Sequence, residues 1–139
     1  LDVPTTIAGL TGAEFARIAI ANPAHAPYGI AAREALQSVG VYEEVKSRLV
    51  LGENVSDTLR LVETGNVDVA IVALSLVIVG DEPYELIPEN LHAPLKQSIV
   101  VTKTGDNESN ARKFIEFLSS QSGRTVMESY GFVLPAGTR

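Results

Sequence analysis

The stretch Ala16-Arg-Ile-Ala-Ile-Ala-Asn-Pro-Ala-His-Ala-Pro-Tyr-Gly29 decides how this chain folds. Its first six residues form a short, largely apolar run that is typical of a buried strand, and Asn22-Pro23 ends that run with a turn. Apolar residues then recur at helical spacing as far as Gly40, where the helix is expected to end. A strand, a tight loop and a helix in this order indicate one unit of an α/β fold.

The same alternation continues along the chain. After an irregular lead-in over residues 1–12, we expect strands at residues 16–21, 50–51, 67–73, 84–87 and 98–102. We expect helices at residues 27–40, 42–49, 55–64, 74–79, 107–120 and 122–130, with Asn54 as the N-cap of the third. This order predicts an α/β domain of three layers, with a mostly parallel central sheet flanked by helices. No shift in composition marks an internal boundary, so residues 1–139 are predicted to form a single domain.

Composition excludes several classes of protein. The chain has 139 residues, of which 45% are apolar, and this content excludes intrinsic disorder. Its formal charge of -6 argues against binding to nucleic acid, which needs Lys and Arg to neutralise phosphates. The longest apolar run, residues 67–80, falls short of the roughly 18 residues that a membrane-spanning helix needs, so no membrane insertion is expected. The absence of cysteine removes thiol catalysis and Cys-type zinc sites.

The sequence contains no recognisable set of catalytic residues. The two histidines, His25 and His92, lie far apart in the sequence, and no nucleophile–base pair, phosphate-binding loop or His-based metal motif is present. We therefore predict a protein that is not an enzyme and needs no metal or cofactor, although a small α/β enzyme stays as a weaker alternative. His25 lies in the turn between the first strand and its helix, where it either hydrogen-bonds the loop backbone or touches a ligand.

Two helix starts carry the most informative chemistry. They lie at residues 22–29 and 52–56, each directly after a predicted strand. The first amides of a helix have no carbonyl partner within the helix and lie at the positive end of its dipole, so they can bind an anion without Lys or Arg. In an open α/β sheet such loops gather at the carboxyl ends of the strands. The amides expected to face one shared oxyanion are those of Tyr28, Gly29, Val55 and Ser56; the alternative is that these loops bind nothing.

At these residues the sequence resembles a known family. The segments 18–36, 52–56, 67–75 and 111–132 are similar to the periplasmic molybdate-binding proteins of ABC transporters, which have the type II solute-binding fold. Asn22-Pro-Ala-His-Ala-Pro-Tyr-Gly29 is the most specific of the matching motifs. The resemblance covers nearly the whole chain and implies a substrate-binding component that holds molybdate or tungstate in a cleft between two lobes.

The resemblance also implies which residues bind the ligand. Tyr28 and Val55 occupy the positions that donate backbone amides to the oxyanion, with Gly29, Ser56 and His25 as neighbours. Some family members add a tyrosine hydroxyl at a position that is Ala73 here, so this contact is expected to be absent. Because Tyr28 acts only through its backbone in this interpretation, Tyr28→Phe is expected to be nearly silent.

The main departure from the family is a missing part. The resemblance places this chain at the second lobe, with residues 104–139 as a C-terminal helical segment that in the family returns towards the first lobe. The first lobe, which supplies the remaining ligand groups, has no counterpart here, and Leu1 in place of Met fits a chain that begins after a boundary. We expect residues 104–139 to expose apolar surface and to favour a homodimer or a swapped dimer; the candidates are Phe114, Phe117, Met127 and Phe132.

By resemblance, the partners are a small oxyanion and the membrane permease of an ABC importer. The protein is expected in the periplasm, after export on a signal peptide that lies outside this sequence. An alternative is the effector-binding domain of a transcription regulator, because the same fold is reused there. The sequence does not choose between molybdate and tungstate, which are nearly isosteric and equally charged.

Overall fold

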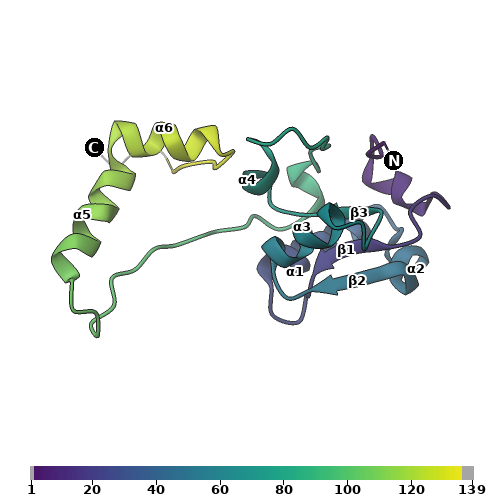
Figure 1. Ribbon diagram of the computed structural model, residues 1–139, viewed down its shortest axis with the longest axis horizontal. Helices are drawn as coiled ribbons and strands as arrows, with labels where there is room; N and C mark the ends of the chain where they lie inside the picture. Colours follow the sequence, from purple (N-terminus) through teal and green to yellow (C-terminus); the bar gives the residue numbers. More distant parts are fainter. Residues whose placement is uncertain (1, 136–139) are drawn as a thin grey trace. The chain divides into compact units, whose positions relative to one another are not determined.

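A computed structural model describes residues 2–135 of the chain (Figure 1). The chain divides into two compact units, Leu1–Leu95 and Lys96–Arg139, and each has its own secondary structure. The single domain over residues 1–139, with residues 104–139 as a C-terminal helical segment, stays a prediction.

The first unit contains a parallel three-stranded sheet with the order β2-β1-β3 (Figure 1). Its strands are β1 (Ile18–Ala21), β2 (Leu49–Gly52) and β3 (Val69–Ile71). Ile18 aligns with Leu49 on one side and with Val69 on the other. All four residues of β1 are buried, so the middle strand is covered on both faces. The predicted α/β class with a parallel sheet is confirmed.

Helices connect these strands. They are α1 (Pro27–Ser38), α2 (Tyr42–Val45) with the 3₁₀ turn η2 (Lys46–Arg48), α3 (Val55–Glu63) and α4 (Leu74–Val77). The connection through α1 leads from β1 to β2 on one side, and the connection through α3 returns past β1 to β3 on the other. Parallel crossovers are right-handed, and opposite directions of travel therefore place α1 and α3 on opposite faces of the sheet.

Side-chain packing agrees with this three-layer arrangement. Ile18 packs with Leu36 of α1 in the main apolar cluster. Side chains alternate along a strand, so Ala19 and Ala21 point to the opposite face, where their small size lets α3 approach closely. Thr58 of α3 is fully buried. A buried Ile or Leu contributes about 1.5–3 kcal/mol, so the packing of Ile18 and Leu36 on the α1 face contributes substantially to stability.

Arg48 fastens the segment that precedes β1. This segment forms a 3₁₀ turn, η1 (Ile7–Thr11), whose Ile7 and Leu10 join the core. The Arg48 guanidinium donates hydrogen bonds to the carbonyls of Gly12 at 2.9 Å and Phe15 at 2.7 Å, and to that of Thr11 at 3.3 Å. A planar guanidinium can serve several carbonyls at once, which fixes this turn against the start of β1.

The second unit is a pair of helices, α5 (Glu108–Ser119) and α6 (Gln121–Ser129). The Ser120 hydroxyl accepts a hydrogen bond from Gly123 N and so caps α6. Within the described residues of this unit, no apolar side chain is buried. Phe114 and Phe117 are about half exposed, as predicted, whereas Met127 and Phe132 are only partly accessible.

The predicted strands at residues 84–87 and 98–102 are wrong. Neither segment pairs with a strand within the described part of the chain, although both have apolar and β-branched residues. Composition alone cannot make a strand, because the backbone groups of a strand need a neighbouring strand as partner. In the first segment Ile87 instead packs against the core, and the 3₁₀ turn η3 (Glu89–Leu91) follows.

Two glycines allow α1 and α3 to begin directly on the ends of the strands. A Cβ atom at Gly29, in the first turn of α1, would collide with the carbonyl oxygen of Ala21 at the end of β1. A Cβ atom at Gly52, the last residue of β2, would lie 2.5 Å from Thr58 Oγ1 and 2.9 Å from Thr58 N. Both helix starts therefore depend on the missing side chain.

We expect Gly29→Ala to lower the free energy of unfolding by about 1–3 kcal/mol, because the added methyl group meets backbone that no side-chain rotation can move. Urea denaturation measures this loss. Gly80→Ala is the matched control, since its Cβ would lie at an ordinary 3.5 Å from Val77 O, and it should change stability by less than about 0.5 kcal/mol. Equal losses in the two variants would contradict the close approach.

Candidate functional site

The starts of α1 and α3 meet at one pocket. The two helices follow β1 and β2, which are neighbours in the sheet and run in the same direction, so both loops lie at the same sheet edge. The pocket has a volume of about 230 Å³, several times the roughly 30 Å³ that a water molecule occupies in the liquid. Its lining residues are His25, Ala26, Pro27, Tyr28, Glu53, Asn54 and Val55.

The first loop, residues 22–26, is folded around Asn22. The Asn22 side chain accepts a hydrogen bond from Ala24 N at 3.0 Å, and its carbonyl accepts one from Ala26 N at 2.9 Å. Pro27 then occupies the first position of α1, which suits a residue without an amide hydrogen. The first bond within the helix is donated by Ile30 N to Ala26 O. The amides of Tyr28 and Gly29 therefore belong to the opening turn of α1.

The second loop is capped as the sequence predicts. The Asn54 side chain accepts a hydrogen bond from Asp57 N at 2.9 Å, and Thr58 N donates the first helical bond to Asn54 O. The amides of Val55 and Ser56 precede that bond in the opening turn of α3. Asn54 is extended, with φ -155° and ψ 178°, and this conformation turns the chain sharply into the helix.

Asp57 stabilises the same loop from inside the helix. Its carboxylate accepts a hydrogen bond from Glu53 N at 3.1 Å and pairs with Arg60 at 2.7 Å. The Arg60 hydrogen bond, and after it the Glu53 amide, hold the pKa of Asp57 below its ordinary value of 3.8. A negative charge in the first turn also suits the helix dipole.

Two hydrogen bonds connect the first loop to the second. Asn22 N donates a hydrogen bond to Gly52 O at 2.8 Å, next to the ends of β1 and β2. Closer to the pocket, His25 Nε2 lies 3.0 Å from Glu53 O. One of the two roles predicted for His25, a hydrogen bond to the loop backbone, is present in the structure. The acceptor is a main-chain carbonyl 28 residues away, and because every residue has such a carbonyl the sequence could not predict this partner.

The predicted site residues are brought together only in part. Tyr28, Val55 and His25 line the pocket. Gly29 is buried against the end of β1, and Ser56 lies exposed in the first turn of α3, outside the lining. Sequence reasoning missed Glu53 as a lining residue, because an exposed acid beside a predicted anion site gives no reason to include it.

The pocket offers main-chain dipoles in place of positive side chains. None of its seven lining residues is Lys or Arg, and its one acid, Glu53, has a side chain that is 85% exposed. Two helix starts that face one space each contribute about half a positive charge. The arrangement suits a small anion that is recognised by hydrogen bonds from neutral groups.

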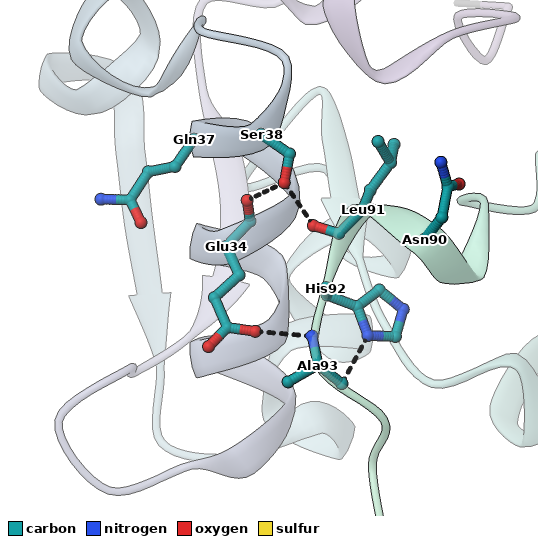
Figure 2. Close-up of a pocket in the computed structure, with 7 residues that line it drawn as sticks. All are labelled: Glu34, Gln37, Ser38, Asn90, Leu91, His92 and Ala93. Carbon is teal, nitrogen blue, oxygen red and sulfur yellow. Dashed lines mark hydrogen bonds between the residues drawn. The ribbon is translucent and has the colours of Figure 1, made fainter.

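A larger depression lies elsewhere on the first unit, between α1 and residues 90–93 (Figure 2). Its polar groups fasten these segments together: Ser38 Oγ donates to the carbonyls of Glu34 and Leu91, and the Glu34 carboxylate accepts from Ala93 N at 2.9 Å. His92 bonds the neighbouring Ala93 carbonyl. These hydrogen bonds join α1 to residues 91–93, so we assign the depression a structural role and not a binding role.

Metal sites and membrane-spanning helices are two further features that bear on function. Among the residues that the structure describes, no three His, Asp or Glu side chains are grouped as metal ligands. Across the same residues, no helix is both long enough and apolar enough to cross a membrane.

Comparison with known proteins identifies the family. Residues 2–133 match the model of the bacterial extracellular solute-binding proteins. The chain belongs to this family. It is a family of solute-binding proteins, which supports the prediction of a binding protein over an enzyme.

Similar sequences agree with the resemblance found above. The molybdate-binding protein ModA of Rhodobacter capsulatus is 39% identical over 118 residues, which is 84% of this chain and 46% of that protein. ModA of Azotobacter vinelandii is 33% identical over 86% of this chain and 49% of its own length. The chain therefore spans about half the length of these relatives.

Solved structures agree as well. The periplasmic molybdate-binding protein of Azotobacter vinelandii superimposes with a TM-score of 0.83 at 28% identity, covering 91% of this chain and 58% of that one. The substrate-binding domain of a putative molybdenum ABC transporter from Clostridium difficile gives a TM-score of 0.70 at 31% identity, covering 92% and 57%.

We expect Asp57→Asn to destabilise the protein near neutral pH and to lose this effect in acid. Because folding lowers the pKa of Asp57, its carboxylate stabilises the fold above the ordinary pKa of 3.8, and the contribution disappears as the pH falls through the lowered value. Urea denaturation at several pH values measures the difference from the unmodified chain. Glu63→Gln, at the other end of α3, is the control. A difference that is the same at every pH would contradict this role for Asp57.

Proposed function

We propose that this chain is part of the substrate-binding component of a molybdate or tungstate ABC importer. The observation that carries the proposal is the meeting of two helix starts at one pocket, in a chain of the solute-binding family. The oxyanion lies between the openings of α1 and α3 and accepts hydrogen bonds from the amides of Tyr28 and Val55. Gly29, Ser56 and His25 are neighbours of these donors.

Neutral donors suit a tetrahedral dianion. Amides hold their protons at every physiological pH, and the two helix dipoles add positive potential at the pocket. Molybdate and tungstate have the same charge and nearly the same size, so the same amides serve both. Ala73 occupies the position where some family members place a tyrosine, and the proposed site therefore has no hydroxyl from the end of β3.

Location and partners follow from the relatives. The similar proteins are named as molybdate-binding or as a putative ABC transporter lipoprotein of Bacillus subtilis, and the similar structure from Azotobacter is periplasmic. We infer that this chain acts outside the cytoplasmic membrane and delivers its oxyanion to a permease. These names favour the transport role over the effector domain of a regulator.

The described residues supply only part of such a site. The resemblance implies a cleft between two lobes, and the chain covers about half the length of its relatives. Each hydrogen bond to a charged group contributes about 1.5–3 kcal/mol, so two or three donors outside this chain account for several orders of magnitude in affinity. We expect weak binding by the chain alone.

Val55→Pro tests the amide mechanism directly. Val55 is the first residue of α3, where proline is tolerated, and extended Asn54 already has the conformation that precedes proline. The variant therefore loses one N–H with little change in the helix. We expect roughly a 10- to 100-fold loss of molybdate affinity, which NMR or calorimetric titration measures.

Val55→Ala keeps the amide and is the matched control, with affinity expected near that of the unmodified chain. Tyr28→Phe also keeps its amide and should be nearly silent. Equal binding by Val55→Pro and Val55→Ala would rule out the Val55 amide as a ligand. Sub-micromolar molybdate binding by this chain alone would contradict the partial site.

We also propose that the α5–α6 helix pair self-associates. Phe114 and Phe117, three residues apart on α5, are 53% and 49% exposed, and Val126 of α6 is 50% exposed. Exposed apolar side chains of this kind are commonly covered at an interface. We expect light scattering to find a dimer, swapped or not, whose fraction rises with concentration. Phe114→Ser with Phe117→Ser should return the chain to a monomer, whereas Lys113→Ser, a polar position on the same helix, should not. A monomer at high concentration would remove this proposal.

A further inference from the structure

His25 bridges the two loops that form the proposed oxyanion site. It belongs to the loop between β1 and α1, yet its Nε2 atom lies 3.0 Å from the carbonyl oxygen of Glu53 in the loop between β2 and α3. The His25 side chain is 52% exposed, so burial does not explain its position. The hydrogen bond to Glu53 O is the contact that joins this side chain to the second loop at hydrogen-bond distance.

We propose that His25 is a positioning residue, which fixes the separation of the two helix starts by donating a hydrogen bond from Nε2 to Glu53 O. This inference rests on the proposed function. A carbonyl oxygen can only accept, so Nε2 must carry the hydrogen. His25 then acts on the oxyanion site by holding together the two loops that carry the amides of Tyr28 and Val55.

The bond is placed where it controls the donor geometry. Tyr28 follows His25 by three residues, and Val55 follows Glu53 by two, so each end of the bond lies next to a proposed donor. The tie from Asn22 N to Gly52 O holds only the base of the two loops, beside the sheet. A second tie at the pocket prevents the loops from pivoting about the first. Donors that are already in position bind more tightly, because less freedom is lost on binding.

The main-chain carbonyl of Glu53 accepts the hydrogen bond, and the Glu53 carboxylate contributes little to holding His25. Glu53 Oε2 lies 3.9 Å from Nε2, beyond hydrogen-bond distance, and the side chain is 85% exposed. An exposed pair of this kind contributes little. Glu53→Gln keeps the carbonyl and removes a negative charge beside the dianion, so this variant should bind molybdate at least as tightly as the unmodified chain.

His25→Leu and His25→Gln provide the test. Leucine fills the space without a donor, whereas the glutamine amide nitrogen reaches about as far as Nε2 and restores the hydrogen. NMR titration with sodium molybdate in the millimolar range should find a roughly 3- to 10-fold weaker affinity for His25→Leu, as expected for one lost hydrogen bond, and recovery to within about twofold for His25→Gln. Urea denaturation should find both variants folded under the titration conditions, so that unfolding does not account for the difference in affinity.

The outcomes separate this inference from the function on which it rests. Nitrogen-15 NMR of the imidazole reports whether Nε2 carries the hydrogen in the absence of any anion. An unmodified chain that has this tautomer but binds no molybdate would overturn the proposed function. A chain that binds molybdate while His25→Leu binds equally well, or while His25→Gln is as weak as His25→Leu, would overturn the positioning role alone. Protonation at Nδ1 in place of Nε2 would also overturn it.

Discussion

The contact between helix starts and strand ends is the constraint on which this molecule depends. The opening turn of α1 lies against the carbonyl of Ala21, and α3 lies against Gly52, at distances that only glycine permits at positions 29 and 52. Because β1 and β2 are adjacent and parallel, this close approach brings two sets of helix amides to one place. With side chains at these glycines the helices would begin farther from the sheet, and the amides would no longer share one pocket.

Most of the first unit could be predicted from its sequence, because its elements are fixed by local patterns and by burial. The run that ends at Ala21, the helix after Pro27 and the Asn54 cap are all present within one or two residues of their predicted bounds. The segments 84–87 and 98–102 failed because pairing is a non-local property. A β-branched run becomes a strand only where a neighbouring edge accepts its backbone, and composition does not report that edge.

The candidate site, like the fold, could be predicted from the sequence only in part. Tyr28 and Val55 could be placed because a strand that ends in a tight loop locates the start of the next helix. The tie from His25 to Glu53 could not, since its acceptor is a main-chain carbonyl that every residue possesses. The close approach at Gly29 was equally hidden, because glycine in a first turn is also compatible with ordinary flexibility. What the sequence did carry was the specific motif of residues 22–29, and the family match agrees with it.

The acidic charge of the chain and its proposed anionic ligand are compatible because they act over different distances. A net charge of -6 is spread over the surface, and physiological salt screens exposed charges beyond about 8 Å. The amides of two helix starts act at hydrogen-bond contact, where screening is ineffective. Neutral donors also need no countercharge when the pocket is empty, whereas a buried Lys or Arg would carry a desolvation cost. In the proposed site, recognition by amides depends on where the donors lie, so the spacing of α1 and α3 is one of the properties that set which anion fits.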